Sequence, residues 1–424
     1  MNELRQGFRQ AYACLGARAE LLDRINVYPV ADGDTGANLR ISLAVLRDCQ
    51  GDGVTLAAQL RRAATGNSGN IAAAFFGELL LLNGLDELAQ GVARGREQAW
   101  RAVATPQPGT MLSVFDCLAA ELAMDAARDG KAILAALQGS VLASTSALPE
   151  LRAAGVVDAG ALAMFVFFDG FFRAVDSGLG PRLPLAELFP GRLAIAADFH
   201  QVVSRSFCVD AIVRPDQVDK ISPRAMTAFG ESVVVVADQD QVKIHIHTTH
   251  PASLRRSLAG MGELVAWSEE SLHHEPQLDQ LSGGAGAGVH IITDAAGSLP
   301  RKLARQQGIS LLDSYIVSGD SAQPESLCAA ETIYRRLRQG EKVTTAQASL
   351  AERHELYGSI CEQYGPSLYL AVGSAFTGNY AAALAWKENN PNGDLLHIVD
   401  SGTASGRLAI LALLVARRAR WGDD

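Results

Sequence analysis

The sequence lacks the features by which several large classes of protein are recognised. Its six cysteines are scattered and include no C-x-x-C pair, so we expect no disulfide framework and a reducing, cytoplasmic environment. The opening segment MNELRQGFRQ has no apolar core of the kind that a signal peptide needs. The longest apolar stretch, residues 161–172, is interrupted by Asp169 and is too short to span a bilayer. We therefore expect a cytoplasmic protein without stable membrane insertion.

Basic residues are also too few for a nucleic-acid-binding protein. The chain has 37 Lys and Arg against 46 Asp and Glu, which gives a formal net charge of −9, whereas phosphate backbones are held by clustered positive charge. No G-x-x-x-x-G-K-[ST] segment occurs, which excludes a P-loop enzyme. With 424 residues, 48% of them apolar, the chain is expected to form two or three globular domains.

The first 175 residues have the pattern of helices. Apolar residues recur three or four apart from Leu4 to Ile25, as on one face of an amphipathic helix. The same spacing recurs in residues 39–46, 71–82, 111–124 and 133–142. Alanine is abundant and β-branched runs are scarce, which favours helix. We predict an all-α domain over 1–176, followed by a Gly- and Pro-rich linker over 177–191.

After this linker the pattern changes to strands. Residues 207–213 and 232–237 read as strands, and 243–250 alternates strictly between apolar and polar. We predict a small α+β domain over 192–280. A second linker, SGGAGAG at 282–288, is not a dinucleotide-binding loop, because a strand follows it and Val289 stands where the last glycine belongs.

The last part, 289–424, alternates strands with helices. Residues 289–294, 367–372 and 395–400 read as strands, and each leads through a polar loop into a helical pattern. Repeated βα units predict a parallel sheet with right-handed crossovers. The predicted fold class is therefore an all-α domain, then a small α+β domain, then an α/β lobe.

The segment NVYPVADGDTGAN at 26–38 contains the first candidate site. Asp32 and Asp34 are separated by one glycine that permits a tight turn, so both carboxylates can face one cation. Magnesium prefers oxygen ligands and commonly shares them with nucleotide phosphates. Asn26 and Asn38 could add neutral oxygen ligands. The helix that follows would point free N–H groups at a phosphate.

This segment has two other interpretations. An EF-hand loop starting at Asp32 would need Gly and Glu where Ala37 and Leu43 stand, which excludes calcium. An Asp-rich turn that only caps a helix remains an alternative. The loops 65–70 and 106–111 are also rich in small residues and precede helical patterns. Each of them alone is more often a simple helix start.

Four ordered motifs resemble a known kinase domain. NVYPVADGDTGAN, GNSGN (66–70), PGTML (108–112) and GVVDAG (155–160) stand in the order found in the ATP-binding DhaL domain of dihydroxyacetone kinases. The first motif is closer still to the kinase component of bacterial fatty acid kinase. The resemblance implies an antiparallel helical barrel that holds ATP through two magnesium ions. By position it implies Asp32 and Asp34 as catalytic metal ligands, Asn26 as a weaker one, and a nucleotide lining of Asn38, Ser68, Gly69, Thr110, Met111 and Asp158.

A second candidate site lies in the middle domain. His245 and His247 are two residues apart on a predicted strand and so share a face, and Cys208 lies on an earlier strand. One cysteine and two histidines form a plausible three-ligand zinc set with an open position. On their own, two histidines on one face are more often surface residues. The middle domain of fatty acid kinases looks similar, which favours the metal; His250 is out of step with the pair.

The last domain resembles the DegV family of fatty-acid-binding proteins. IITDAAGSLP (291–300), TTAQAS (344–349), GSAFTGNY (373–380) and VDSGTASG (399–406) follow that family's order. The ligand-binding edge of an open parallel sheet is the carboxyl end of its strands, although most of these Asp, Ser and Thr residues are expected only to cap helices. The resemblance implies that Thr345 and Ser374 hold a lipid carboxylate. Ala346 and Gly373 replace two usual serines, and the segment is about half as long as a DegV protein, which suggests a half-domain or a truncated chain.

Together these features predict an ATP-dependent kinase that phosphorylates a fatty acid presented by its own DegV-like domain. A carboxylate is already ionised at neutral pH and needs no general base, and no histidine lies in the helical motifs, the nearest being His200. The alternatives are a dihydroxyacetone-type kinase and a non-catalytic lipid-binding or regulatory protein. The expected partners are ATP and a fatty acid or other small acceptor, with no nucleic acid; a homodimer is left open.

Overall fold

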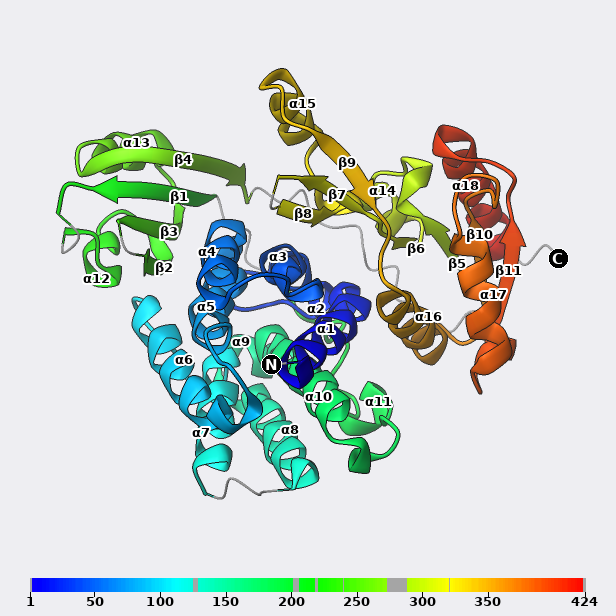
Figure 1. The fold of residues 1–424 in the computed structure, drawn as a ribbon, viewed down its shortest axis with the longest axis horizontal. Coiled ribbons are helices and arrows are strands. Elements are labelled where there is room, and N and C mark those ends of the chain that lie inside the picture. Colours follow the sequence, from blue (N-terminus) through cyan, green and yellow to red (C-terminus); the bar gives the residue numbers. More distant parts are fainter. Residues whose placement is uncertain are drawn as a thin grey trace. The chain divides into compact units, whose positions relative to one another are not determined.

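The computed structural model describes residues 2–124, 129–200, 206–217, 220–238, 240–272, 288–319 and 321–421. The chain divides into two compact units, Met1–Glu275 and Pro276–Asp424 (Figure 1). The end of the predicted middle domain, 273–280, and nearly all of the second predicted linker, 282–287, lie outside the described residues. No helix in the described ranges is long and apolar enough to cross a membrane.

The first unit begins with helices, as predicted. Their bounds are α1 Asn2–Ala17, α2 Ala19–Arg24, α3 Thr35–Ser42, α4 Gly53–Ala63, α5 Gly66–Leu79, α6 Leu88–Ala102, α7 Met111–Met124, α8 Gly130–Ala147, α9 Pro149–Ala154 and α10 Ala159–Val175. Every residue of α10 from Ala159 to Phe172 is buried, because neighbouring helices cover all of its faces. The helix predicted from Leu4 to Ile25 is in fact two helices that separate at Arg18.

The segment 177–191 is not the free linker that its Gly and Pro content suggested. It contains α11, Leu185–Leu188, and its residues Leu179, Leu185 and Phe189 are buried. The ring of Phe189 lies 5.2 Å from that of Phe165 in α10. The apolar side chains between the glycines and prolines therefore fasten this segment to the helical part.

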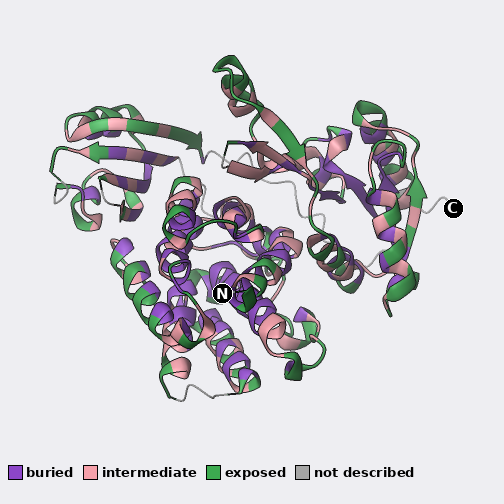
Figure 2. Ribbon diagram, in the orientation of Figure 1, coloured by how far each residue is buried: buried purple, intermediate pink, exposed green. Residues whose placement is uncertain are grey.

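The middle of the chain forms an antiparallel sheet in the order β2-β3-β1-β4. Its strands are β1 Phe207–Pro215, β2 Glu231–Asp238, β3 Gln241–Thr248 and β4 Gly262–Ser271. The helices α12, Pro223–Met226, and α13, Pro251–Ala259, pack on one face. The sequence did not predict β4, which is an exposed edge strand without an apolar repeat (Figure 2).

The other face of this sheet packs on the helical part. Val234 of β2 forms a small apolar cluster with Ala74 of α5 and Ala102 of α6. The backbone N–H of Ala104 donates to the carbonyl of Val233 at 3.0 Å. Strands β1 and β3 are thus covered on both faces, and polar side chains on their helical face are held in a largely buried layer.

The second unit contains a four-stranded parallel sheet in the order β11-β10-β5-β6. Its strands are β5 His290–Asp294, β6 Ile309–Leu312, β10 Ser367–Ala371 and β11 Leu396–Asp400. The helices α14 Arg301–Gln306 and α18 Ser405–Trp421 contribute to one apolar core, and α16 Leu350–Tyr364 and α17 Asn379–Asn389 contribute to another. This region is the predicted α/β end of the chain.

A second sheet in this unit was not predicted. The strands β7 Tyr315–Ser318, β8 Ser321–Pro324 and β9 Val343–Ala346 form an antiparallel sheet in the order β8-β7-β9, with α15 Ala330–Arg338 between β8 and β9. Thr344 and Thr345, the first residues of the second DegV-like motif, lie within β9 of this sheet. The expectation that the polar residues of this motif follow a strand of the parallel sheet, at its carboxyl edge, is therefore wrong. Strands of four residues carry too little periodicity to be recognised in the sequence.

Candidate active site

A cavity of about 230 Å³ lies between the helices and the middle sheet of the first unit. Ten of the predicted site residues line it: Asn26, Asp32, Asp34, Ser68, Thr110, Met111, Asp158, Cys208, His245 and His247. Two predicted residues, Asn38 and Gly69, are not among the described residues that line this cavity. Motifs spread over more than two hundred residues of sequence therefore meet in one place.

Asp32 and Asp34 form an acidic pair in the loop between α2 and α3. The pKa of Asp34 is raised well above its usual value, first by burial and then by the charge of Asp32 and a hydrogen bond with it. Gly33 has φ +68°, which permits the tight turn between the two acids. Two carboxylates forced together in a cavity repel each other unless a cation offsets their charge. This donor set fits magnesium.

Asn26 holds the acidic loop in shape. Its Oδ1 accepts hydrogen bonds from the backbone N–H groups of Asp34 and Thr35, both at 3.2 Å, and from the Thr35 hydroxyl at 3.0 Å. Its Nδ2 donates to the carbonyls of Tyr28 and Val30. The amide oxygen that could bind a metal thus already has three donors, so loop geometry is its visible role.

The start of α3 does not offer the free N–H groups that the sequence suggested. The N–H groups of Gly36 and Ala37 donate to Oδ1 of Asp23 at 2.7 and 3.0 Å. Because this helix start is buried, its donors need partners inside the protein. Asp23 is a buried residue of α2. Sequence reasoning missed its role, because no local pattern links it to Gly36, which is 13 residues away.

The start of α5 is likewise bound by a side chain that sequence reasoning missed. Oδ2 of Asp210 in β1 accepts from the Gly66 N–H and the Thr65 hydroxyl at 3.2 Å each, and Oδ1 accepts from Nδ2 of Asn70 at 3.0 Å. Asp210 stands two residues after Cys208 and therefore on the same face of β1. That alternation was the one signal available in the sequence.

Asn38 and Gly69 serve the packing of α3 on α5. A Cβ on Gly69 would lie 2.0 Å from Oγ of Ser42, and one on Gly66 would lie 2.0 Å from Nδ2 of Asn38. The small residues of GNSGN (66–70) therefore let α3 and α5 approach closely. Ser68 does reach the cavity, and its hydroxyl lies 3.5 Å from the carbonyl of Thr35.

Thr110, Met111 and Asp158 complete the helical side of the cavity. The Thr110 hydroxyl donates to the carbonyl of Gln107 at 3.0 Å, in the turn before α7. Oδ1 of Asp158 accepts from the N–H of Ala161 at 2.7 Å and so caps α10. Burial raises the pKa of Asp158 to about 7. At neutral pH this carboxyl therefore carries a proton far more often than an exposed aspartate does.

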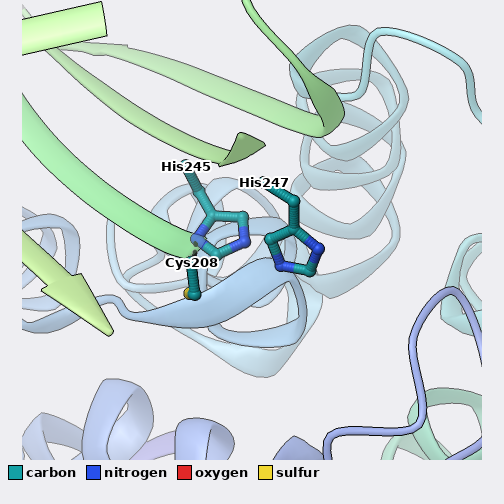
Figure 3. Close-up of side chains that lie close together, drawn as sticks. All are labelled: Cys208, His245 and His247. Carbon is teal, nitrogen blue, oxygen red and sulfur yellow. Dashed lines mark hydrogen bonds between the residues drawn. The ribbon is translucent and has the colours of Figure 1, made fainter. Parts of the chain in front are cut away.

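Cys208, His245 and His247 form the Cys/His set on the sheet side of the cavity (Figure 3). One ligand atom from each lies within 4.8 Å of the others, and Sγ of Cys208 is 3.9 Å from Nδ1 of His245. Nε2 of His245 and Nδ1 of His247 are buried without a hydrogen-bond partner among the described residues. His250 is exposed at the start of α13 and takes no part. The set fits a zinc ion with an open position.

Electrostatics connect the Cys/His set with the acidic pair. Burial lowers the pKa of His247 to about 3, so its ring is neutral and can donate a lone pair. Burial also raises the pKa of the Cys208 thiol, and nearby carboxylates, among them Asp34 and Asp32, raise it further. A cation is needed to convert such a thiol into a thiolate.

In the second unit, the predicted lipid-binding residues are exposed. Thr345 lies on β9, and Ser374 follows β10, where its N–H donates to Oδ1 of Asp400 at 3.1 Å. Asp294 is buried and accepts from the Tyr369 hydroxyl, the Val372 N–H and Nδ2 of Asn379. Asp294 and Asp400 thus order the loops at the edge of the parallel sheet by accepting from neighbouring strands and loops. The expectation that they cap the following helices is not met, since the Asp294 side chain makes no capping hydrogen bond.

Family models match three successive segments of the chain. A DAK2 domain matches residues 29–173, the FakA-like middle domain of fatty acid kinase matches 204–277, and the DegV family, described as uncharacterised, matches 288–424. The chain carries a DAK2 domain, a FakA-like middle domain and a DegV domain. The predicted resemblance is confirmed, and the cavity lies between the DAK2 domain and the middle domain.

Curated relatives are similar in sequence to this chain over part of their length. An uncharacterized protein of Staphylococcus saprophyticus is 28% identical over 309 residues, which cover 64% of this chain and 55% of that protein. Protein YloV of Bacillus subtilis is 27% identical over 298 residues, 62% of this chain and 53% of that protein. The chain thus spans about half the length of the curated relatives it matches.

Solved structures of DegV-family proteins are similar to about a third of the chain. The DegV fatty acid binding protein from Bacillus subtilis is 18% identical with a TM-score of 0.28, over 32% of this chain and 48% of that chain. A DegV family protein from Thermus thermophilus, whose structure concerns fatty acid binding, is 19% identical with a TM-score of 0.30, over 32% and 49%.

Proposed function

We propose that the chain is an ATP- and magnesium-dependent phosphotransferase of the fatty acid kinase type. The observation that carries this proposal is the meeting, in one cavity, of the acidic pair, Ser68, Thr110 and Asp158 from the DAK2 domain with the Cys/His set. In this proposal the DAK2 domain has the antiparallel barrel arrangement of its family, over 1–176. The middle domain spans 192–280, and the DegV domain spans 289–424.

The acidic pair supplies the magnesium site in this proposal, and Asn26 orients the pair. Bound magnesium offsets the charge of the phosphates of ATP during transfer. Because the N–H groups of Gly36 and Ala37 are engaged by Asp23, the phosphates depend more on the metal and on Ser68 and Thr110 than on the start of α3. Gly69 contributes indirectly, through the packing of α3 on α5, and Asn38 contributes through the hydrogen bond of its side chain with Asp34.

The proposed acceptor is a fatty acid carboxylate, which needs no base because it is already ionised. Thr345 and Ser374 of the DegV domain are proposed to hold this carboxylate. A hydroxy-ketone such as dihydroxyacetone is the second candidate, and one observation favours it. Asp158 lines the cavity with a pKa near 7, as suits a group that accepts a proton from a hydroxyl. We place the protein in the cytoplasm and leave a homodimer as a further proposal.

Transfer of labelled phosphate from ATP distinguishes the two acceptors. With magnesium present, we expect the γ-phosphoryl of ATP to move to oleate and to give an acyl phosphate that hydroxylamine converts to a hydroxamate. Oleate should be offered both free and bound to a DegV-family protein, since this chain spans about half the length of its curated relatives. Transfer to dihydroxyacetone alone would replace the fatty acid proposal with the second candidate. Transfer to neither acceptor would refute both.

The Cys/His set is proposed to bind zinc. We expect one zinc ion per chain in purified protein, and Cys208→Ser is expected to lower the zinc content at least about 10-fold because a thiolate ligand is lost. Cys328→Ser is the matched control, since Cys328 lies in the DegV domain. Metal analysis of the three proteins is the measurement. Equal zinc in the Cys208→Ser protein would refute this assignment.

A further inference from the structure

Asp210 is shared by the Cys/His set and the start of α5. Its Oδ1 lies 3.3 Å from Nδ1 of His245 and accepts from Nδ2 of Asn70, and its Oδ2 accepts from Thr65 and Gly66. Only 13% of its side chain is exposed. The Asp210 carboxylate therefore contacts His245 in its own domain and the start of α5 in the DAK2 domain. Asn70 of α5 and Asp210 are 140 residues apart in the sequence.

We propose that Asp210 is a positioning residue that couples metal binding at the Cys/His set to nucleotide binding at the start of α5. This inference rests on the zinc site of the proposed function. Asp210 is proposed neither as a metal ligand nor as a group that contacts the acceptor.

The first half of the coupling is the orientation of His245. A carboxylate accepts hydrogen bonds, so Asp210 favours the tautomer in which Nδ1 of His245 carries the proton. The lone pair is then on Nε2, the buried nitrogen that has no hydrogen-bond partner among the described residues. Carboxylates placed in this way fix the ring of a metal-binding histidine and raise its basicity.

The second half is the position of the loop before α5. Gly66, Asn67 and Ser68 line the cavity, and the N–H of Gly66 is fixed by Asp210. If the Asp210 carboxylate shifts toward a metal-bound His245, the Gly66 N–H that donates to it must shift as well. The loop before α5 then moves with Gly66. Coupling through a shared group is reciprocal, so nucleotide must change metal affinity as much as metal changes nucleotide affinity.

Cobalt(II) is the probe, because its thiolate absorption reports only a site that contains cysteine. We expect the Kd of the full chain for Co²⁺, with excess Mg²⁺ present, to change at least about 5-fold when a non-hydrolysable ATP analogue is added. In Asp210→Asn we expect Co²⁺ binding about 10- to 100-fold weaker, an altered absorption spectrum, and no effect of the nucleotide. Asp240→Asn, an exposed position in the same domain, is the matched control and should behave as the unchanged chain.

A second variant keeps the test decisive if Asp210→Asn does not fold, as judged by circular dichroism. Thr65→Val removes one donor to Asp210 but leaves the contact with His245, so it should keep the Co²⁺ affinity and reduce the nucleotide effect. Unchanged coupling in either folded variant would overturn the inference. Absence of Co²⁺–thiolate absorption in the unchanged chain would overturn the zinc site as well. None of these readouts requires turnover, so a failure of the kinase activity would be seen separately.

Discussion

Asp34→Asn is expected to lower phosphotransfer about 1000-fold while making the magnesium-free protein more stable. Burial, and after it the charge of Asp32, raises the pKa of Asp34, so ionising both carboxyls without a cation costs folding free energy. Removing one charge relieves the repulsion, and a gain of about 1 kcal/mol in the free energy of unfolding is typical of such relief. The same change replaces a negatively charged oxygen ligand of the proposed magnesium site with a neutral amide oxygen, which holds the cation and offsets its charge much less well.

Two measurements on each protein check this prediction. Magnesium and ATP should raise the melting temperature of the unchanged chain and leave that of Asp34→Asn almost unaffected. Asp116→Asn is the matched control, because Asp116 lies on α7 in an exposed ion pair with Arg96 and does not line the cavity. It should keep both activity and the response to magnesium. Full magnesium-promoted ATP binding by Asp34→Asn would show that the acidic pair is not the metal site.

Local patterns, together with the resemblance to one family, were enough to predict ten of the described residues that line the cavity. The spacing of Asp32 and Asp34 around one glycine and of His245 and His247 on one strand each describe a short piece of chain, whose geometry is set by local backbone preferences. The order of the motifs then indicated one family, and the structure brings ten of the predicted residues to one cavity. The helical beginning, the sheet-containing middle and the α/β end were predictable for the same reason.

The two buried acids that hold the starts of α3 and α5 were not predicted from the sequence. Asp23 and Asp210 engage the starts of α3 and α5, yet each is a single acid in an ordinary helix or strand pattern. Only the fold shows which buried helix starts need an acceptor inside the protein. The four-residue strands β7 and β9 escaped for a different reason, since so short a run holds only two residues per face.

Gly36, the last residue of the segment DGDTG (32–36), packs against the backbone of α2. A Cβ at this position would lie 2.1 Å from the carbonyl oxygen of Ala19 and 2.7 Å from its carbonyl carbon. Both are backbone atoms of α2, which cannot rotate away as a side chain would. Gly36→Ala should therefore lower the free energy of unfolding by about 3 kcal/mol or more, because overpacking a well-filled contact forces backbone shifts. Urea unfolding followed by circular dichroism measures this loss.

Gly139→Ala gives the opposite expectation and serves as the control. Gly139 lies in α8 with no atom within 4 Å of an added Cβ, so alanine should stabilise the helix by about 0.5–1 kcal/mol. If the glycine of the motif served only the close approach of a phosphate, Gly36→Ala would instead fold with unchanged stability and lose ATP binding alone. A large loss of stability would mean that Gly36 keeps α3 close to α2, where Asp23 engages the N–H groups of Gly36 and Ala37.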